Sequence, residues 1–228
     1  MLQSARIEST ADGSPTLYIP ELDEHYHSVN GAIQESKHVF IDAGLRPIAQ
    51  KSKNISVLEI GFGTGLNALL TLLEGKKLNL NIHYTTLELY PLPLNLAEQL
   101  NYPEVLQTKD ENLFINLHQA EWGKVVEITP NFTLHKIETD FSKPNFETGN
   151  EAFNLIYLDA FAPNKQNGVW TQTVFNRLFG KTIQGGILTT YCAKGIVRRM
   201  MQQAGYTVER LPGPPGKREM LRAFRPGG

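Results

Sequence analysis

The sequence predicts a doubly wound α/β fold, in which a mostly parallel β-sheet ends in an antiparallel hairpin and carries helices on both faces. From residue 56 onward, short apolar segments typical of strands alternate with segments of helical periodicity. The first strand runs directly into a glycine-rich turn, as in nucleotide-binding α/β proteins. The last two strands are separated only by the Pro- and Gly-rich residues 212–216. Because parallel neighbours need a crossover of about a dozen residues, these two must be antiparallel.

The expected elements cover almost the whole chain. Residues 5–9 and 16–19 flank a Gly-Ser-Pro turn and predict an N-terminal β-hairpin extension. A helix over residues 32–43 is expected to end at Gly44. The seven strands expected in the sheet are residues 56–60, 81–88, 132–137, 154–159, 186–191, 206–211 and 219–224. The helices expected between them are residues 65–73, 93–100, 112–119, 171–179 and 193–203.

Length and composition exclude several classes of protein. A chain of 228 residues accommodates one α/β domain with a substantial core, and its 41% hydrophobic and 20% charged residues are ordinary for a globular protein. The single cysteine, Cys192, excludes an intrachain disulfide and a cysteine cluster that holds zinc. The N-terminus lacks the apolar region of a signal peptide, and no apolar run approaches about 18 residues. We therefore expect a cytoplasmic protein with no membrane partner.

The charges are unevenly distributed along the chain. Residues 181–228 carry nine Lys or Arg and only two Asp or Glu. Residues 1–180 carry 13 Lys or Arg and 21 Asp or Glu. A basic C-terminal quarter on an acidic body is expected if one face binds a polyanion. Chance segregation of solvated surface charges is an equally good interpretation of this pattern alone.

The glycine-rich turn at residues 61–65 predicts a nucleotide-like cofactor. A dinucleotide fingerprint would place its third glycine one residue later, where this sequence has Leu66. The E-x-G-x-G-x-G arrangement instead resembles motif I of S-adenosylmethionine-dependent methyltransferases. The alternative is a glycine-rich turn that binds no ligand. The candidate cofactor residues of this segment are Glu59, Gly61, Gly63, Gly65 and Asn67.

Three further acids stand at expected strand ends, where doubly wound sheets bind their ligands. Glu88 closes the second strand, where a carboxylate can accept hydrogen bonds from both ribose hydroxyls of an adenosine. Asp140 follows the third strand and can accept from the adenine amino group, although a helix N-cap is an equally good interpretation. Asp159 ends the fourth strand. Because all three acids are in register with the glycine turn, we interpret them as cofactor ligands.

The segment after Asp159 predicts the acceptor site. Phe161 and Pro163 would form a stiff pocket wall, and Lys165 would contact a phosphate, with a solvated loop lysine as the alternative. Trp170 would stack on a base, although an ordinary core anchor at the start of the next helix is the favoured interpretation.

Several blocks of the sequence resemble the methyltransferase domain of the bacterial bifunctional enzyme that makes 5-methylaminomethyl-2-thiouridine at the tRNA wobble position. The resemblance covers nearly the whole chain, and its first and last blocks are more specific than the glycine turn. The blocks are Tyr-His-Ser-Val-Asn-Gly at residues 26–31, Gly-Phe-Gly-Thr-Gly-Leu-Asn at 61–67, Glu-Leu-Tyr-Pro-Leu at 88–92, Asp-Ala-Phe-Ala-Pro at 159–163, Gly-Ile-Val-Arg-Arg at 195–199 and Gly-Lys-Arg-Glu-Met-Leu at 216–221.

This resemblance implies a class I methyltransferase fold and methyl transfer from S-adenosyl-L-methionine to the 5-aminomethyl nitrogen of wobble uridine (U34). Asp159 would orient the amine first and accept its proton second, because a nearby carboxylate also stabilises the unreactive ammonium form. Tyr26 and Asn30 would cover the methionine end of the cofactor. We expect residues 1–50 to form an extension that packs on the cofactor site, and residues 51–228 to form the methyltransferase domain.

The chain departs from this family in two respects. The bifunctional enzyme continues into a flavin-dependent oxidase, whereas this sequence stops at Gly228 and is expected to represent the stand-alone form. A separate enzyme is then expected to supply the aminomethyl group. Asn164 and the Gln-Asn-Gly at residues 166–168 also replace the small residue and the acidic, proline-bearing loop that the family leads us to expect.

The basic C-terminal residues would bind phosphates of the tRNA anticodon region, with an affinity that falls steeply with salt. His25, His27 and His38 have no accompanying array of carboxylates, and we expect no metal site. The candidate tRNA-binding residues are Lys194, Arg198, Arg199, Lys217 and Arg218.

Three other functions stay open on the sequence alone. The first is a methyltransferase or an aminopropyl transferase that acts on a small-molecule amine, against which the basic C-terminal segment argues. The second is a catalytically silent tRNA-binding partner of a separate oxidase, against which Glu59, Glu88 and Asp159 argue. A dehydrogenase is the least favoured because of Leu66 and the terminal hairpin.

Overall fold

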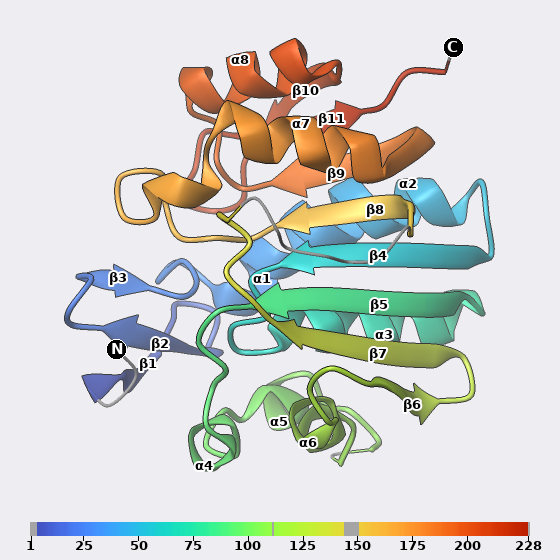
Figure 1. Ribbon diagram of the computed structural model, residues 1–228. Helices are drawn as coiled ribbons and strands as arrows, with labels where there is room; N and C mark the ends of the chain where they lie inside the picture. The colour runs from blue at the N-terminus through green and yellow to red at the C-terminus, as the bar shows by residue number, and fades with distance from the viewer. Residues whose placement is uncertain (1–3, 111, 144–150, 228) are drawn as a thin grey trace.

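The computed structural model describes residues 4–110, 112–143 and 151–227. Its central feature is an eight-stranded sheet with the strand order β10-β11-β9-β8-β4-β5-β7-β6 (Figure 1). The strands of this sheet are β4 (Asn54–Ile60), β5 (Asn81–Glu88), β6 (Val125–Thr129), β7 (Phe132–Glu138), β8 (Phe153–Leu158), β9 (Thr182–Thr190), β10 (Thr207–Pro212) and β11 (Glu219–Phe224).

The directions of the strands confirm the predicted fold class. The five central strands, from β9 to β7, are parallel, whereas β11 is antiparallel to both β9 and β10. The expected count of seven strands falls one short, because β6 pairs antiparallel with β7 at the sheet edge. This short and half-exposed strand is joined to β7 by a tight turn, and its sequence, Val-Val-Glu-Ile-Thr, alternates too briefly to stand out.

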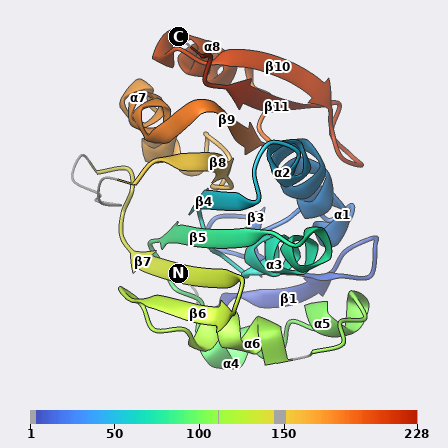
Figure 2. The same cartoon turned by 90° about the vertical axis from the view of Figure 1, so that its right-hand side faces the viewer.

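Helices cover both faces of the sheet (Figures 1 and 2). One face carries α7 and α8, and the other carries α3 together with the helical segment that precedes β4. The expected helix over residues 93–100 is reduced to one turn, and a separate turn begins at Tyr102, with Pro103 in its first positions. The helices are α1 (Ala32–Ser36), the π-helix η2 (Lys37–Leu45), α2 (Arg46–Ala49), α3 (Leu66–Leu78), α4 (Leu94–Ala97), α5 (Tyr102–Val105), α6 (Asn112–Gln119), the 3₁₀ turn η3 (Asn167–Val169), α7 (Gln172–Lys181) and α8 (Gly195–Ala204).

The prediction that Gly44 ends the first helix is wrong, because the helical segment continues through η2 and α2 to Ala49. Gly44 lies against the sheet instead. A Cβ atom at this position would stand 3.2 Å from Cδ1 of Leu155 and 3.3 Å from Cε1 of Tyr157. The missing side chain therefore allows the π-helix to approach β8 closely, and it does not terminate the helix.

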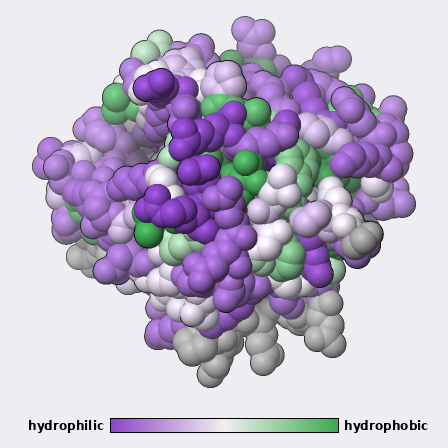
Figure 3. Space-filling view, turned by 90° about the horizontal axis from the view of Figure 1, so that it is seen from above, coloured by the Kyte–Doolittle hydropathy of each residue, from purple (hydrophilic) through white to green (hydrophobic). Residues whose placement is uncertain are grey.

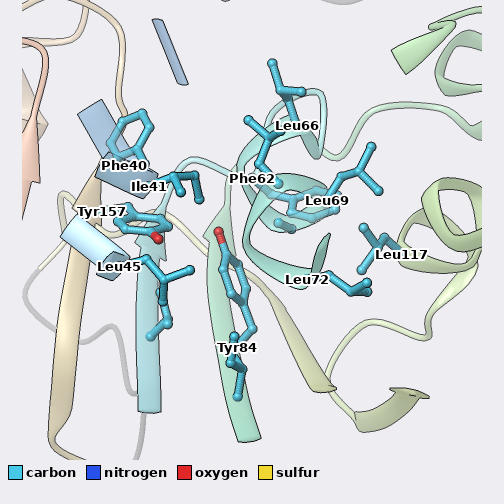
Figure 4. Close-up of a cluster of buried hydrophobic side chains, with 14 of the residues drawn as sticks. Phe40, Ile41, Leu45, Phe62, Leu66, Leu69, Leu72, Tyr84, Leu117 and Tyr157 are labelled. Atoms are coloured by element: carbon cyan, nitrogen blue, oxygen red, sulfur yellow. The ribbon is translucent and has the colours of Figure 1, made fainter. Parts of the chain in front are cut away.

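The core consists of two apolar layers, one on each face of the sheet. Along β4, Ile55 and Val57 belong to the layer beneath α3, and Leu58 and Ile60 belong to the layer beneath α7. This alternation follows from the period of two along a strand. Figure 4 shows the first layer, in which the hydroxyl ends of the buried Tyr84 and Tyr157 turn toward each other.

A second, three-stranded antiparallel sheet lies beside the carboxyl ends of the central parallel strands (Figure 1). It contains the expected N-terminal hairpin, β1 (Arg6–Ser9) and β2 (Pro15–Ile19), together with the two-residue strand β3 (Glu24–His25). The division of the chain into residues 1–50 and 51–228 stays a prediction. In the central sheet, the order reverses between β4 and β8, and this switch point is where doubly wound folds bind ligands.

Candidate active site

A cavity opens at this switch point, between the carboxyl ends of β4, β5 and β8 and the N-terminal sheet. Nine of the residues that the sequence predicts for the site lie in its wall. They are Tyr26, Gly61, Gly63, Asn67, Glu88, Asp140, Asp159, Phe161 and Lys165. Gly65 lies just behind the wall as the N-cap of α3.

The glycine turn leaves no room for side chains. Gly61 and Gly63 have φ values of +95° and +51°, which disfavour any residue with a Cβ. A Cβ at Gly61 would stand 2.4 Å from the carbonyl oxygen of Asp159, and one at Gly63 would stand 2.9 Å from Cδ1 of Tyr26. The chain therefore bends against its neighbours and exposes bare backbone to the cavity.

Glu88 ties the end of β5 to the glycine turn. Its Oε2 accepts a hydrogen bond from the backbone N–H of Gly63, and its Oε1 accepts from those of Leu89 and Tyr90, all at 2.9 Å. Burial raises the pKa of this carboxyl group, and the three backbone hydrogen bonds oppose that rise. A carboxylate has about four acceptor positions, so Glu88 retains one for a ribose hydroxyl.

Asp159 follows β8 and meets the start of α3 at the cavity wall. Its Oδ2 accepts a hydrogen bond of 2.7 Å from the side-chain amide of Asn67. Burial raises the pKa of Asp159 to about 7, against the opposing effects of Asn67 and of the more distant Lys217. A carboxyl group with this pKa exchanges a proton near neutral pH, as a general base does.

Asp140 lines the cavity and also organises its own turn. Its Oδ1 accepts hydrogen bonds from the backbone N–H of Ser142, at 3.1 Å, and from the hydroxyl of Ser142, at 2.5 Å. Asp140 therefore lines the cavity and organises a turn, but no helix begins at this turn within the described residues, so the structure does not show a helix N-cap here. Oδ2 stands 3.8 Å from Nζ of Lys143 and is the oxygen left for an adenine amino group.

The N-terminal sheet and the residues next to it cover one side of the cavity. Nζ of Lys165 donates a hydrogen bond of 2.6 Å to the carbonyl oxygen of Leu22, which joins the loop after β8 to the connection between β2 and β3. The rings of Tyr26 and Phe161 meet edge to face with centroids 5.1 Å apart. The expected phosphate contact of Lys165 thus competes with a contact within the protein.

Glu59 does not reach the cavity. Its side chain is fully buried on the α3 face of β4, where Oε2 accepts a hydrogen bond of 2.8 Å from the hydroxyl of Thr86. Burial raises the pKa of Glu59 well above its usual range. The acid of the E-x-G-x-G-x-G motif therefore lies behind the cofactor cavity.

Eight other predicted site residues also lie outside the cavity. Trp170 is buried as a core residue, and its Nε1–H donates to the carbonyl oxygen of Phe161 at 2.8 Å. Lys217 forms an ion pair with the buried Glu35, and its Nζ stands 3.9 Å from the ring centroid of Tyr191. The others are Asn30 beside Gly216, Pro163 in the loop after β8, and Lys194, Arg198, Arg199 and Arg218 near α8 and the final hairpin.

Sequence reasoning missed part of the cavity wall. Phe62 and Tyr90 line it and stand next to predicted residues, so their positions in the Gly-Phe-Gly and Glu-Leu-Tyr-Pro segments were a usable signal. Ile19, Leu22 and His27 also line it, but they come from the N-terminal sheet. Ile19 and Leu22 belong to no motif, and only the packing of that sheet brings them to the site, whereas His27 stands next to Tyr26 in the block at residues 26–31.

The structure fits S-adenosylmethionine on its own geometry. Gly61 and Gly63, where a Cβ would collide with Asp159 or Tyr26, present bare backbone to the cavity, and Glu88 and Asp140 offer acceptors at the ends of β5 and β7. Within the described residues, no group of three or more His, Cys, Asp or Glu side chains is arranged to hold a metal ion. The described part of the chain also contains no helix long and apolar enough to span a bilayer.

Comparisons with known proteins agree with this geometry. Residues 106–226 match a family model described as S-adenosyl-L-methionine-dependent methyltransferase. The chain is 30% identical, over 237 residues, to the tRNA 5-methylaminomethyl-2-thiouridine biosynthesis bifunctional protein MnmC of Cupriavidus metallidurans, covering 98% of this chain and 34% of that protein. It is 31% identical to the MnmC protein of Leptospira borgpetersenii, and the match covers 87% of this chain and 32% of that protein. The chain thus spans about a third of the length of these relatives.

A solved structure shows the same fold. The crystal structure of MNMC2 from Aquifex aeolicus superposes with a TM-score of 0.81 at 24% sequence identity, covering 99% of this chain and 73% of that one. A putative class I S-adenosylmethionine-dependent methyltransferase from Listeria monocytogenes superposes with a TM-score of 0.51 at 14% identity, and the superposition covers 88% of this chain and 62% of that one. The chain belongs to the S-adenosyl-L-methionine-dependent methyltransferase family.

Proposed function

We propose that this protein methylates the 5-aminomethyl nitrogen of wobble uridine in tRNA, with S-adenosylmethionine as the methyl donor. The observation that carries the proposal is the placement of Asp159, a buried carboxylate with a pKa near 7, at the carboxyl end of β8. The substrate class comes from the names of the MnmC relatives and from the basic C-terminal segment. The site residues named above are part of this proposal.

The residues of the chain would handle the proton of the reaction. Bound S-adenosylmethionine supplies an electrophilic methyl group. For the transfer to the amine to be completed, the amine nitrogen would have to lose one proton. Asn67 holds Oδ2 of Asp159, which leaves Oδ1 to orient the amine and to receive that proton.

Basic residues near the cavity would contact the tRNA backbone. Arg199 and Arg218 are exposed, and so is Lys194, whose Nζ donates a hydrogen bond of 3.2 Å to the side chain of Asn164. The end of the molecule that carries α8 and β10 is seen in Figure 3, where hydrophilic side chains (purple) cover most of the surface. The positive charges of the exposed Lys194, Arg199 and Arg218 suit a phosphate backbone, whose contacts position the nucleic acid without reading its sequence.

The aminomethyl substrate would come from a separate enzyme that exposes the primary amine on the uridine. The product is a secondary amine that carries one methyl group. Both reactions are expected in the cytoplasm, where tRNA is modified.

The deciding experiment has two steps. Calorimetry with S-adenosylmethionine tests the cofactor cavity, and transfer of a labelled methyl group to tRNA that carries 5-aminomethyluridine tests the acceptor. We expect binding and stoichiometric transfer. Cofactor binding with transfer only to a free amine would replace the tRNA proposal by the small-molecule alternative, and binding with no transfer would indicate a silent binding protein.

A further inference from the structure

Glu59 occupies the middle of the central sheet, although it opens the cofactor motif. Its Cα pairs with Thr86 of β5 on one side and with Tyr157 of β8 on the other. The side chain points into the apolar layer beneath α3 and has no exposed surface. An ionised carboxylate in such a place requires strong partners, because desolvation of a charge is far more expensive than that of a neutral group.

The hydrogen bonds around Glu59 are incomplete. Thr86 donates to Oε2, but Oε1 of Glu59 and Oδ1 of Asn67 are both buried and have no donor in the described structure. The hydroxyl of Tyr84 is likewise without a partner there. Asn67 and Tyr84 both lie close enough to the Glu59 carboxyl group to lower its pKa, although neither forms a hydrogen bond of ordinary geometry with it. Each unsatisfied buried group destabilises the fold, so an arrangement that satisfies all three is favoured.

The charged and titratable neighbours of Glu59 decide whether its carboxyl group is ionised or protonated. Among the described residues, the titratable groups that act on the Glu59 carboxyl group are Asp159, Tyr84 and Tyr157, and none supplies a positive charge. Burial is the largest effect and raises the pKa of Glu59, as does Asp159, whereas Thr86, Asn67 and Tyr84 oppose that rise. One proton on Oε1 removes the buried charge and creates the donor that Oδ1 of Asn67 lacks. The same oxygen then accepts from the hydroxyl of Tyr84 through its free lone pair.

We propose that Glu59 is a neutral positioning residue, whose carboxyl proton donates to Oδ1 of Asn67 and holds the Asn67 amide in the orientation that donates to Asp159. A continuous path of hydrogen bonds then runs from Thr86 through Glu59 and Asn67 to Asp159. It connects the middle of β4 to the acceptor site, and it gives the buried acid of the motif a role in aligning Asp159. Only the turnover part of the test rests on the proposed methylation of tRNA.

The protonation state is tested on the protein without substrate. Carbon-13 NMR of glutamate carboxyl groups, assigned by comparison with Glu59→Gln, should show that Glu59 stays protonated well above pH 4.5. A folded-state pKa above the unfolded value also means that wild-type stability falls as pH rises above about 4.5. Glu59→Gln should therefore gain stability over wild type as pH rises. An ionised Glu59 signal at pH 7 would overturn the proposal.

The positioning role is tested with two substitutions of similar size. Glu59→Leu removes both hydrogen bonds and should lower kcat about 10- to 100-fold. It should also move the acidic limb of the pH–rate profile to higher pH, because Asn67 lowers the pKa of Asp159. In Glu59→Gln, the new amide can accept a hydrogen bond from Thr86 and donate one to Asn67, so kcat should stay close to that of wild type.

The alternative outcomes are distinguishable. Equal loss in Glu59→Gln and Glu59→Leu, or an unmoved acidic limb in Glu59→Leu, would contradict the positioning role. If Glu59→Leu fails to fold, the comparison of Glu59→Gln with wild type by NMR and by calorimetry with S-adenosylmethionine still decides. If no variant methylates tRNA, the proposed function fails, while the carboxyl titration stands on its own.

Discussion

The side-chain amide of Asn67 donates a hydrogen bond of 2.7 Å to Oδ2 of Asp159, and this bond joins the start of α3 to the end of β8. The two residues are 92 positions apart in the chain. They meet because the glycine turn delivers α3 to the same edge of the sheet at which β8 ends. This bond therefore links the helix that follows the glycine turn directly to Asp159.

Asp159→Asn should separate cofactor binding from chemistry. The substitution keeps the shape of the side chain but removes the group that accepts the proton, so we expect kcat to fall by about 10²- to 10⁴-fold. The affinity for S-adenosylmethionine should change by less than about tenfold. In wild type, the ionised form of Asp159 grows as pH rises through about 7, and kcat/KM should rise with it. An unchanged kcat in Asp159→Asn, measured with aminomethyluridine tRNA, would remove Asp159 from the mechanism.

Gly63→Ala should weaken cofactor binding by at least about tenfold, or roughly 1.4 kcal/mol. The new Cβ would stand 2.9 Å from Cδ1 of Tyr26 and would push that ring into the cavity. Gly123→Ala is the matched control, because Gly123 also has a positive φ but has no atom within 4 Å of the added Cβ. Both variants should lose about 1–2 kcal/mol of stability from backbone strain. Calorimetry that shows equal cofactor affinities in the two variants would contradict the close fit at Gly63.

The local part of this fold was predictable from sequence. Glu88 and Asp159 fall at strand ends that periodicity locates, and parallel strands bring their carboxyl ends to one edge. Gly44 was not predictable in the same way, since a helix stop and a close approach to a sheet both favour glycine. Only the packed structure, with Leu155 and Tyr157 against that position, distinguishes them.

The orientation of charged side chains was the least predictable part of the site. Lys217 has the pattern of a phosphate contact, and its partner Glu35 lies 182 residues earlier in the chain. Glu59 has the pattern of a cofactor ligand, yet the period of two along β4 turns it into the core beneath α3. Spacing gives the position of a side chain along a strand, whereas its partners depend on which distant element packs there.

Lys217→Gln should lower the stability of the fold, whereas Arg218→Gln should weaken tRNA binding. Lys217 neutralises Glu35, whose side chain is only 8% exposed, so its loss should lower the free energy of unfolding by about 1–3 kcal/mol. Arg218 is exposed, and its loss should change stability by no more than about 0.5 kcal/mol. Arg218→Gln should instead weaken tRNA binding and reduce the slope of log K against log[salt] by about one. Urea unfolding and salt-dependent tRNA binding check both, and a Lys217→Gln protein of wild-type stability would contradict this assignment.

His27→Gln and His118→Gln should each alter the dependence of stability on pH. Burial lowers the pKa of both histidines to about 4, so both are neutral in the folded protein at pH 5, whereas the unfolded chain binds protons there. A lowered pKa contributes stability that is present above about pH 6.5 and is lost as pH falls toward 4. Each variant should therefore lose less free energy of unfolding than wild type as pH falls, by on the order of 1–3 kcal/mol.

The comparison must be made between variant and wild type at pH 7 and pH 5. Glu59, Glu88 and Asp159 have raised pKa values and act in the opposite direction over this range, so the wild-type slope alone decides nothing. Because the same acids are present in all three proteins, their effect cancels in the difference. If the variants lose as much free energy of unfolding between pH 7 and pH 5 as wild type does, then His27 and His118 are not held neutral by the fold.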